Sequence, residues 1–223
     1  MTVDWGDSSP TESDATFLEH TYPNTNNKII ELSCPDLSKL IDIHSGNSNF
    51  VDDMPSFSAY TSLETWDIYY NDFDGSPPSF SACTALTYID FYSNGLDGNM
   101  PSFATCTELT FWGCAINGFT GTMPDFSPCT KLTVWQADSN NFTGYTIGSF
   151  ATQKDLGGIS FDNNNLTQIA VDAVLADCVT SLSIPGRVTC TVTLDGASMA
   201  SPSVDGYDDV DTLIAAGWDV TVN

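Results

Sequence analysis

Basic residues are scarce in this sequence. Among 223 residues, Lys and Arg total 5 against 29 Asp and Glu, which gives a formal net charge of −24. Binding to nucleic acid requires a basic surface that neutralises phosphates, so nucleic acid is excluded as a partner. The charge is typical of a protein kept soluble in a salty or extracellular setting. Binding of divalent cations or of a basic partner is the alternative interpretation.

Long apolar runs are also missing. No stretch is long enough to cross a bilayer, so we expect no membrane insertion. The N-terminal segment, residues 1–7, does not have the pattern of a signal peptide. The chain is therefore cytosolic, exported by another route, part of a virion, or a fragment whose leader is missing. Extracellular, cell-surface or virion placement is the expectation that fits the repeats described below.

Residues that usually carry catalysis or hold metals are few. His20 and His44 are the only histidines, and the sequence has no G-x-S-x-G motif, no C-x-x-C motif and no Cys/His cluster for zinc. Two loops, residues 71–75 and 94–99, gather acids and glycines but lack the full twelve-residue calcium-binding pattern. We predict that these loops are turns and that the chain has no cofactor, with a weak calcium site as the alternative.

What the sequence does contain is a repeat of 23 residues. Leucine recurs at this step, with one step of 24 at the end, in Leu40, Leu63, Leu86, Leu109, Leu132 and Leu156. Apolar residues follow the leucines after three, five and ten positions, except for Ser45 in the first copy, and after eight positions comes Ser48, Asn71, Asn94, Asn117, Asn140 or Asn164. Positions three and five lie on the same side of a strand, so both enter the core. We expect the Asn side chains to bond to backbone where each strand ends and to form a ladder.

The second half of each repeat reads G-x-M-P-x-F-x-x-C-T, as in residues 98–107 and 121–130. With the L-x-x-Φ-x-Φ-x-x-N-x-Φ half, this pattern resembles the leucine-rich repeat, in particular the plant-type G-x-I-P form and the BspA-like bacterial or phage surface type. The resemblance implies an α/β solenoid, mostly β: a right-handed coil with a parallel sheet. The recurring proline argues against long helices on the convex side, where we expect extended or 3₁₀ turns.

The chain divides into three predicted parts. Residues 34–166 are five to six repeats, and residues 1–33 are an N-terminal β cap, with predicted strands over 3–8 and 28–32. The cap's W-G-D and H-T-Y segments resemble a truncated PKD-like module with Trp5 and Tyr22 as its small core, and we predict that its missing strand leaves an edge for a neighbouring subunit. Residues 167–223 are an α/β C-terminal cap. It has a helix over 167–181, a strand over 188–194, a helix over 208–216 ended by Gly217, and a final strand over 218–222. The apolar spacing in the first helix predicts one buried face with Ile169, Val171, Val174, Leu175 and Cys178. This tail resembles the ending of repeat proteins from marine bacteria and their phages.

Seven cysteines are present. Cys83, Cys106 and Cys129 keep the 23-residue step, and Leu37 and Tyr60 occupy the same offset in earlier repeats. Because these residue types replace one another, we expect buried free thiols in that row. Cys178 and Cys190 lie off the repeat and are the best candidates for a disulfide. Asn141 and Asn165 begin N-x-T motifs and are possible glycosylation sites in a eukaryotic secretory host.

The concave side of the predicted sheet carries the candidate site. Outward-facing positions of successive strands form one patch of aromatic and acidic side chains, namely His44, Thr65, Asp67, Tyr69, Tyr70, Tyr88, Asp90, Tyr92, Phe111 and Gln136. Tyrosine offers a flat apolar ring and a polar tip, which suits sugar rings and protein surfaces. Aromatic packing across the strands explains the same pattern without a ligand.

We therefore predict a non-enzymatic recognition or structural protein of a microbe or its phage: an adhesin, a fibre component or a filament subunit. Its expected partners are a protein or glycan bound by the concave face, and further copies of itself bound through the terminal caps. The alternative is a carbohydrate-active or other hydrolytic enzyme that uses Asp67 and Asp90 as acid–base groups. The fold alone does not decide between these functions.

Overall fold

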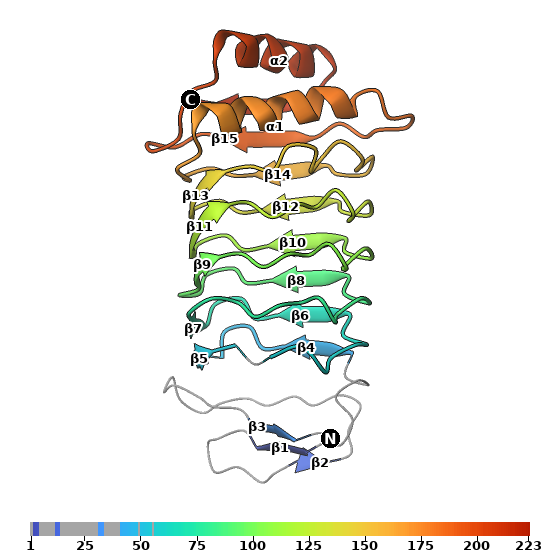
Figure 1. The fold of residues 1–223 in the computed structure, drawn as a ribbon, viewed down its shortest axis with the longest axis vertical. Coiled ribbons are helices and arrows are strands. Elements are labelled where there is room, and N and C mark those ends of the chain that lie inside the picture. The colour runs from blue at the N-terminus through green and yellow to red at the C-terminus, as the bar shows by residue number, and fades with distance from the viewer. Residues whose placement is uncertain (1, 5–11, 14–30, 34–40, 49, 55) are drawn as a thin grey trace.

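The computed structural model describes residues 2–4, 12–13, 31–33, 41–48, 50–54 and 56–223. The repeats form a column of stacked coils, with one row of strands on each side and two helices at the C-terminal end (Figure 1). The longer row is an eight-stranded sheet in which every pairing is parallel, in the order β16-β15-β14-β12-β10-β8-β6-β4. Its strands are β4 (Asp42–His44), β6 (Thr65–Asp67), β8 (Tyr88–Asp90), β10 (Phe111–Gly113), β12 (Val134–Gln136), β14 (Gly158–Ser160), β15 (Thr191–Leu194) and β16 (Asp219–Val222).

A second row of short strands lies on the opposite side of the coils. It is split into the sheets β5-β7 and β13-β11-β9, both parallel. The strands are β5 (Val51–Asp53), β7 (Asp72–Asp74), β9 (Asp97–Asn99), β11 (Gly118–Thr122) and β13 (Asn141–Gly144). Within the described coils this side carries turns and strands and no helix, as the recurring proline predicts. The acidic segments 71–75 and 94–99, predicted as turns, therefore contain strands instead.

The predicted asparagine ladder is confirmed. The Nδ2 of Asn117 donates to the carbonyl of Cys114 at 3.0 Å in its own coil and to that of Phe91 at 2.9 Å in the preceding coil. Its Oδ1 accepts from the Leu96 backbone N–H at 3.1 Å. Equivalent bonds recur at each rung: Asn71, Asn94, Asn140 and Asn164. Each amide thus satisfies backbone groups that the turn leaves unpaired, and it ties one coil to the next.

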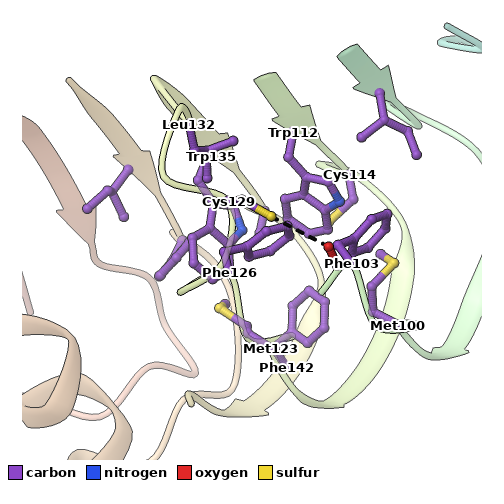
Figure 2. Packing of buried hydrophobic residues seen from close by; sticks show 14 of the residues in the cluster. Met100, Phe103, Trp112, Cys114, Met123, Phe126, Cys129, Leu132, Trp135 and Phe142 are labelled. Carbon is purple, nitrogen blue, oxygen red and sulfur yellow. Dashed lines mark hydrogen bonds between the residues drawn. The ribbon is translucent and has the colours of Figure 1, made fainter. Parts of the chain in front are cut away.

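Between the two rows of strands lies one continuous core. Phe80, Phe103 and Phe126 stack on one another with ring centroids 5.4 and 5.5 Å apart. Trp112 and Trp135 pack edge-on beside them, as Figure 2 shows for the central coils. No single coil encloses these rings, so a repeat becomes stable only against its neighbours.

The row of thiols is also part of this core. Cys83, Cys106 and Cys129 are free and fully buried, as predicted. The Sγ of Cys129 donates to the Phe103 carbonyl at 3.5 Å (Figure 2). In the last coil Gln153 takes the position of the cysteine, and its Nε2 donates to the Phe126 carbonyl at 2.6 Å. Burial raises the pKa of the Cys106 and Cys129 thiols to about 12.

At the N-terminal end, three short strands form an antiparallel sheet of order β2-β1-β3. They are β1 (Thr2–Asp4), β2 (Glu12–Ser13) and β3 (Glu31–Ser33). Two of these correspond to the predicted strands, and β2 was not predicted. Trp5 and Tyr22, the predicted core of this cap, lie outside the described residues, as do His20 and Cys34. The boundaries of the three parts stay predictions.

The C-terminal cap confirms the predicted helices and strands but shifts their ends. α1 (Gln168–Ser181) begins at the N-cap Thr167, and α2 (Val204–Ala215) begins four residues before the predicted start. The Oγ of the N-cap Ser203 accepts from the Gly206 N–H at 3.2 Å and fixes that start. Gly217 follows the helix with φ of 87°, as predicted. β15 and β16 then continue the repeat sheet in parallel, which the sequence did not indicate.

Two predictions in this cap are wrong. Ile169 was placed on the buried face of α1, yet it is 80% exposed. It precedes Val171 by two residues, or about 200° of helical rotation, so it faces the opposite side. Cys178 and Cys190, the best candidates for a disulfide, are both free and buried instead. Cys190 donates from Sγ to the Thr191 carbonyl at 3.3 Å. Among the described residues, no helix has both the length and the apolar character needed to cross a membrane.

Candidate recognition face

The outward side of the long sheet brings most of the predicted patch together. Parallel register sets Thr65 beside Tyr88 and Tyr88 beside Phe111. Two residues further on, the same register sets Asp67 beside Asp90. We call the following side chains the aromatic face: Thr65, Asp67, Tyr69, Tyr70, Tyr88, Asp90, Tyr92 and Phe111.

The aromatic rings of this face form two groups. Tyr88 and Phe111 stack with ring centroids 4.5 Å apart and planes only 10° from parallel. Tyr70 meets Tyr69 at 5.9 Å and Tyr92 at 5.0 Å, both edge to face. These contacts confirm that aromatic packing across the strands orders the face. They leave the rings half-exposed, because no element of the described chain covers this side of the sheet.

The Tyr69 ring packs against Gly46 of the preceding coil. A Cβ at Gly46 would lie 2.3 Å from a carbon of the Tyr69 ring, so only glycine lets the ring lie against the backbone there. The same holds less tightly at Gly113, where a Cβ would approach the Phe111 ring and Oδ1 of Asp90 at 3.0 Å. The small residues between the aromatics are therefore part of how the face is shaped.

Two carboxylates lie between the aromatic groups. Oδ1 of Asp90 accepts from the Tyr92 N–H at 2.8 Å, and Oδ2 accepts from the Tyr88 hydroxyl at 3.4 Å. Burial against these rings, with a smaller contribution from Asp67, raises the pKa of Asp90 to about 6. Burial and Asp90 likewise raise the pKa of Tyr88 above its ordinary value.

His44 and Asp67 are in contact, and Gln136 is not part of the cluster. The His44 Nδ1 lies 3.2 Å from Oδ2 of Asp67, while Oδ1 of that carboxylate is buried without a partner in the described structure. Gln136 is exposed on β12, next to Gly113 and away from the tyrosines. No group of three or more His, Cys, Asp or Glu residues in the described ranges is arranged to hold a metal ion.

A recurring backbone corner ends each outward strand. One non-glycine residue per coil has positive φ there, and the set is Asn47, Tyr70, Ser93, Ile116, Ser139 and Asn163. Asn adopts this left-handed conformation readily, whereas a bulky side chain does so at a cost of about 1 kcal/mol. Tyr70, at φ of 52°, is thus held in a conformation that its side chain disfavours, and it remains 48% exposed.

Beside Tyr70 the surface has a shallow hollow of about 290 Å³. It is lined by Asn47, Tyr70, Asn71, Asp72 and Ser93. Of these, only Tyr70 was predicted as a site residue. Asn47 and Ser93 could have been found from the sequence, because they occupy the same offset as Tyr70, one residue before the asparagine of the ladder.

The two predicted glycosylation sites are exposed neighbours. Nδ2 of Asn165 donates to Oδ1 of Asn141 at 3.2 Å, and both side chains reach solvent. The ladder asparagines are the residues before them, Asn140 and Asn164, which are buried. The ladder therefore does not account for asparagine at the two N-x-T motifs, and glycosylation there stays a prediction.

No protein-family model and no curated protein matches this sequence. Among solved structures, the chain is similar to the plant peptide hormone receptor RGFR1 in complex with RGF2, with 22% identity and a TM-score of 0.57 over 70% of this chain and 24% of the receptor chain. It is also similar to the leucine-rich-repeat ectodomain of GASSHO1/SCHENGEN3 from Arabidopsis thaliana in complex with CASPARIAN STRIP INTEGRITY FACTOR 2, with 18% identity and a TM-score of 0.58 over 78% and 23%.

A third similar structure is the ectodomain of the receptor kinase SOBIR1 from Arabidopsis thaliana, with 17% identity and a TM-score of 0.52 over 56% of this chain and 70% of that one. The chain spans about a quarter of the length of the first two receptors. Together with the stacked coils and the asparagine ladder, these likenesses establish that the chain has the leucine-rich-repeat solenoid fold.

Proposed function

We propose that this protein is a non-enzymatic recognition protein that binds a protein or glycan through the aromatic face. The observation that carries the proposal is the stacked pair of Tyr88 and Phe111 on an uncovered sheet, next to the Tyr69–Tyr70–Tyr92 group. Outward aromatic rings lower solubility unless something covers them, and rigid aromatic rings are favoured anchors at interfaces. Two of the similar plant receptors are in complex with RGF2 and with CASPARIAN STRIP INTEGRITY FACTOR 2, which supports a binding role for this fold.

Placement outside the cell or on a virion is part of the same proposal. An excess of 24 negative charges suits an exposed surface and keeps the chain away from nucleic acid. An adhesin, a phage fibre component and a filament subunit all fit this description. A filament subunit would have to self-associate through the terminal caps. Electron microscopy of the purified chain tests whether it does. Fibres support a filament subunit, and single particles at every concentration argue for a binder.

The binding proposal is tested with a glycan array and a phage-displayed random peptide library as probes. The variant Tyr88→Ala/Phe111→Ala removes the stacked pair, and we expect it to lose at least about tenfold in affinity for the probes that the wild type selects. The control Ile147→Ala/Ile169→Ala removes apolar side chains that are 74% and 80% exposed elsewhere. Equal affinity of the two double variants and the wild type would overturn the proposal.

A hydrolytic enzyme is the second candidate, favoured by one observation. The pKa of Asp90, raised to about 6, lies in the range of a general acid, and Asp67 lies on the next strand. The variant Asp67→Asn/Asp90→Asn should abolish any hydrolysis of the glycans that the array identifies. Unchanged probes after incubation with the wild type would remove this candidate.

A further inference from the structure

We propose that the hollow beside Tyr70 is a subsite for one neutral sugar residue. This rests on the proposed binding function and deepens it, because it names the class of ligand and the place where it is held. The hollow lies at the corner where three successive coils leave the aromatic face. It is therefore continuous with the Tyr69–Tyr70–Tyr92 group.

Polar side chains around the hollow are unoccupied. Within the described structure, the side chains of Asn47, Asp72 and Ser93 make no hydrogen bond, whereas the amide of Asn71 is fully used by the ladder. An amide, a carboxylate and a hydroxyl together offer donors and acceptors at close range. A sugar ring presents hydroxyl groups that need both. The hollow thus matches a hydroxyl-rich ligand better than an apolar one.

Tyr70 supplies the apolar contact that a sugar ring also needs. Its ring is held edge to face by Tyr69 and Tyr92, and its hydroxyl donates to the Tyr92 hydroxyl at 3.4 Å. The ring is therefore fixed in place before any ligand arrives, which lowers the entropy lost on binding. At the same corner the other coils mostly carry Asn or Ser.

Charge and size narrow the ligand further. No cation lines the hollow, Asp72 is a carboxylate, and the whole chain is strongly negative, so an anionic sugar is excluded. The hollow is shallow, and its volume of about 290 Å³ is below that of enclosed small-molecule sites, so it has room to contact no more than a single ring. A protein ligand needs a far larger contact area and a mainly apolar anchor pocket, so this corner alone does not fit one.

The test uses saturation-transfer NMR with the full chain and simple methyl glycosides. The probes are methyl glucoside, galactoside, mannoside and N-acetylglucosaminide, with methyl glucuronide as the anionic comparison. We expect transfer to at least one neutral glycoside with a dissociation constant of about 1 mM, and none to the glucuronide. Transfer to no neutral glycoside, or stronger transfer to the glucuronide, would overturn the proposal.

The corner itself offers a matched pair of variants. Tyr70→Asn places at the corner a residue that two other coils carry there, so the fold should tolerate it, and sugar affinity should fall at least about tenfold. Ile116→Asn makes the same change at the next corner but one, away from the hollow, and should leave affinity unchanged. Thermal unfolding of both variants checks that they are folded. Equal sugar affinity in Tyr70→Asn and the wild type would show that the subsite is wrong.

This outcome is separable from failure of the proposed function. One outcome is that Tyr88→Ala/Phe111→Ala no longer binds the array or library probes, while Tyr70→Asn binds both these probes and the glycosides as well as the wild type does. The aromatic face would then bind its ligand as proposed, and the hollow would not bind a sugar. If only peptide probes bind the wild type, the ligand is a protein and the sugar subsite is likewise refuted.

Discussion

The hydroxyl of Tyr145 donates a hydrogen bond of 2.6 Å to Oδ2 of Asp177, and the backbone N–H of Gly148 donates to the same oxygen at 2.6 Å. Tyr145 belongs to the last repeat and Asp177 to α1, and both are buried. A buried carboxylate is costly unless it is hydrogen-bonded. This contact therefore ties the C-terminal cap to the repeats and closes the end of the core.

Removing that hydroxyl should loosen the cap. We expect Tyr145→Phe to lower the free energy of unfolding by about 1–3 kcal/mol, because Asp177 keeps its burial and loses a donor. Urea denaturation measures the change. Tyr207→Phe is the matched control, since its exposed hydroxyl donates to the Asn223 carbonyl at 2.7 Å and should matter less. Equal losses in the two variants would contradict the role given to Asp177.

The asparagine ladder makes a second prediction. Asn117→Ala would leave the carbonyls of Phe91 and Cys114 and the N–H of Leu96 without their partner, so we expect a loss of at least about 2 kcal/mol. Asn165→Ala removes an exposed amide whose side-chain hydrogen bond is to the equally exposed Asn141, and it should cost less than about 0.5 kcal/mol. Denaturant unfolding measures the loss of unfolding free energy in both variants. A similar loss at both positions would show that the asparagine ladder does not stabilise the fold.

The carboxyl of Asp90 predicts how stability depends on pH. Its folded pKa of about 6 is above its ordinary value of 3.8, so the folded state keeps the proton over a range where the unfolded chain has lost it. This group therefore contributes stability at low pH that is lost as pH rises from about 4 through 6. The shift corresponds to about 3 kcal/mol, which solvent screening of this partly exposed side chain reduces to about 1 kcal/mol.

Asp90→Asn should remove the loss of stability that accompanies ionisation of Asp90 as pH rises. We expect the variant to gain about 1 kcal/mol over the wild type at pH 7 and to differ little near pH 4, as measured by urea unfolding at both values. Asp97→Asn, at an exposed position of β9, is the control and should show no such pH-dependent gain. A gain of the same size at both pH values would contradict the raised pKa.

Thiol reactivity tests the state of the cysteines. In a Cys34→Ser variant, the six remaining cysteines are all free and buried, so native protein should react slowly with a thiol-reactive dye. Unfolding in guanidinium without reductant should expose six reactive thiols. A count of four would instead mean that Cys178 and Cys190 form the disulfide that the sequence suggested.

Most of the fold was predictable because it depends on spacing alone. A step of 23 residues brings equivalent positions into register, so the rows of Phe103, Asn117 and Cys106 follow from the repeat. The aromatic pairs followed too, since strand alternation sends Tyr88 and Phe111 outward on neighbouring strands. The features that the sequence did not predict lie in the C-terminal cap, which has no repeat. They depend on how the cap packs on the last coil, and they are the N-cap Ser203, the exposure of Ile169, and the free thiols of Cys178 and Cys190.

The candidate site divides in the same way. The sequence by itself determined which side chains leave the sheet on its outward side, because a strand alternates and a parallel stack keeps register. Only the tertiary structure decided that Tyr70 takes a left-handed corner, and that this corner lies beside Asn47, Asp72 and Ser93 from three coils. Such a hollow arises where neighbouring coils meet, because hydrogen bonding between parallel strands holds the coils about 4.8 Å apart and so brings side chains of different coils together.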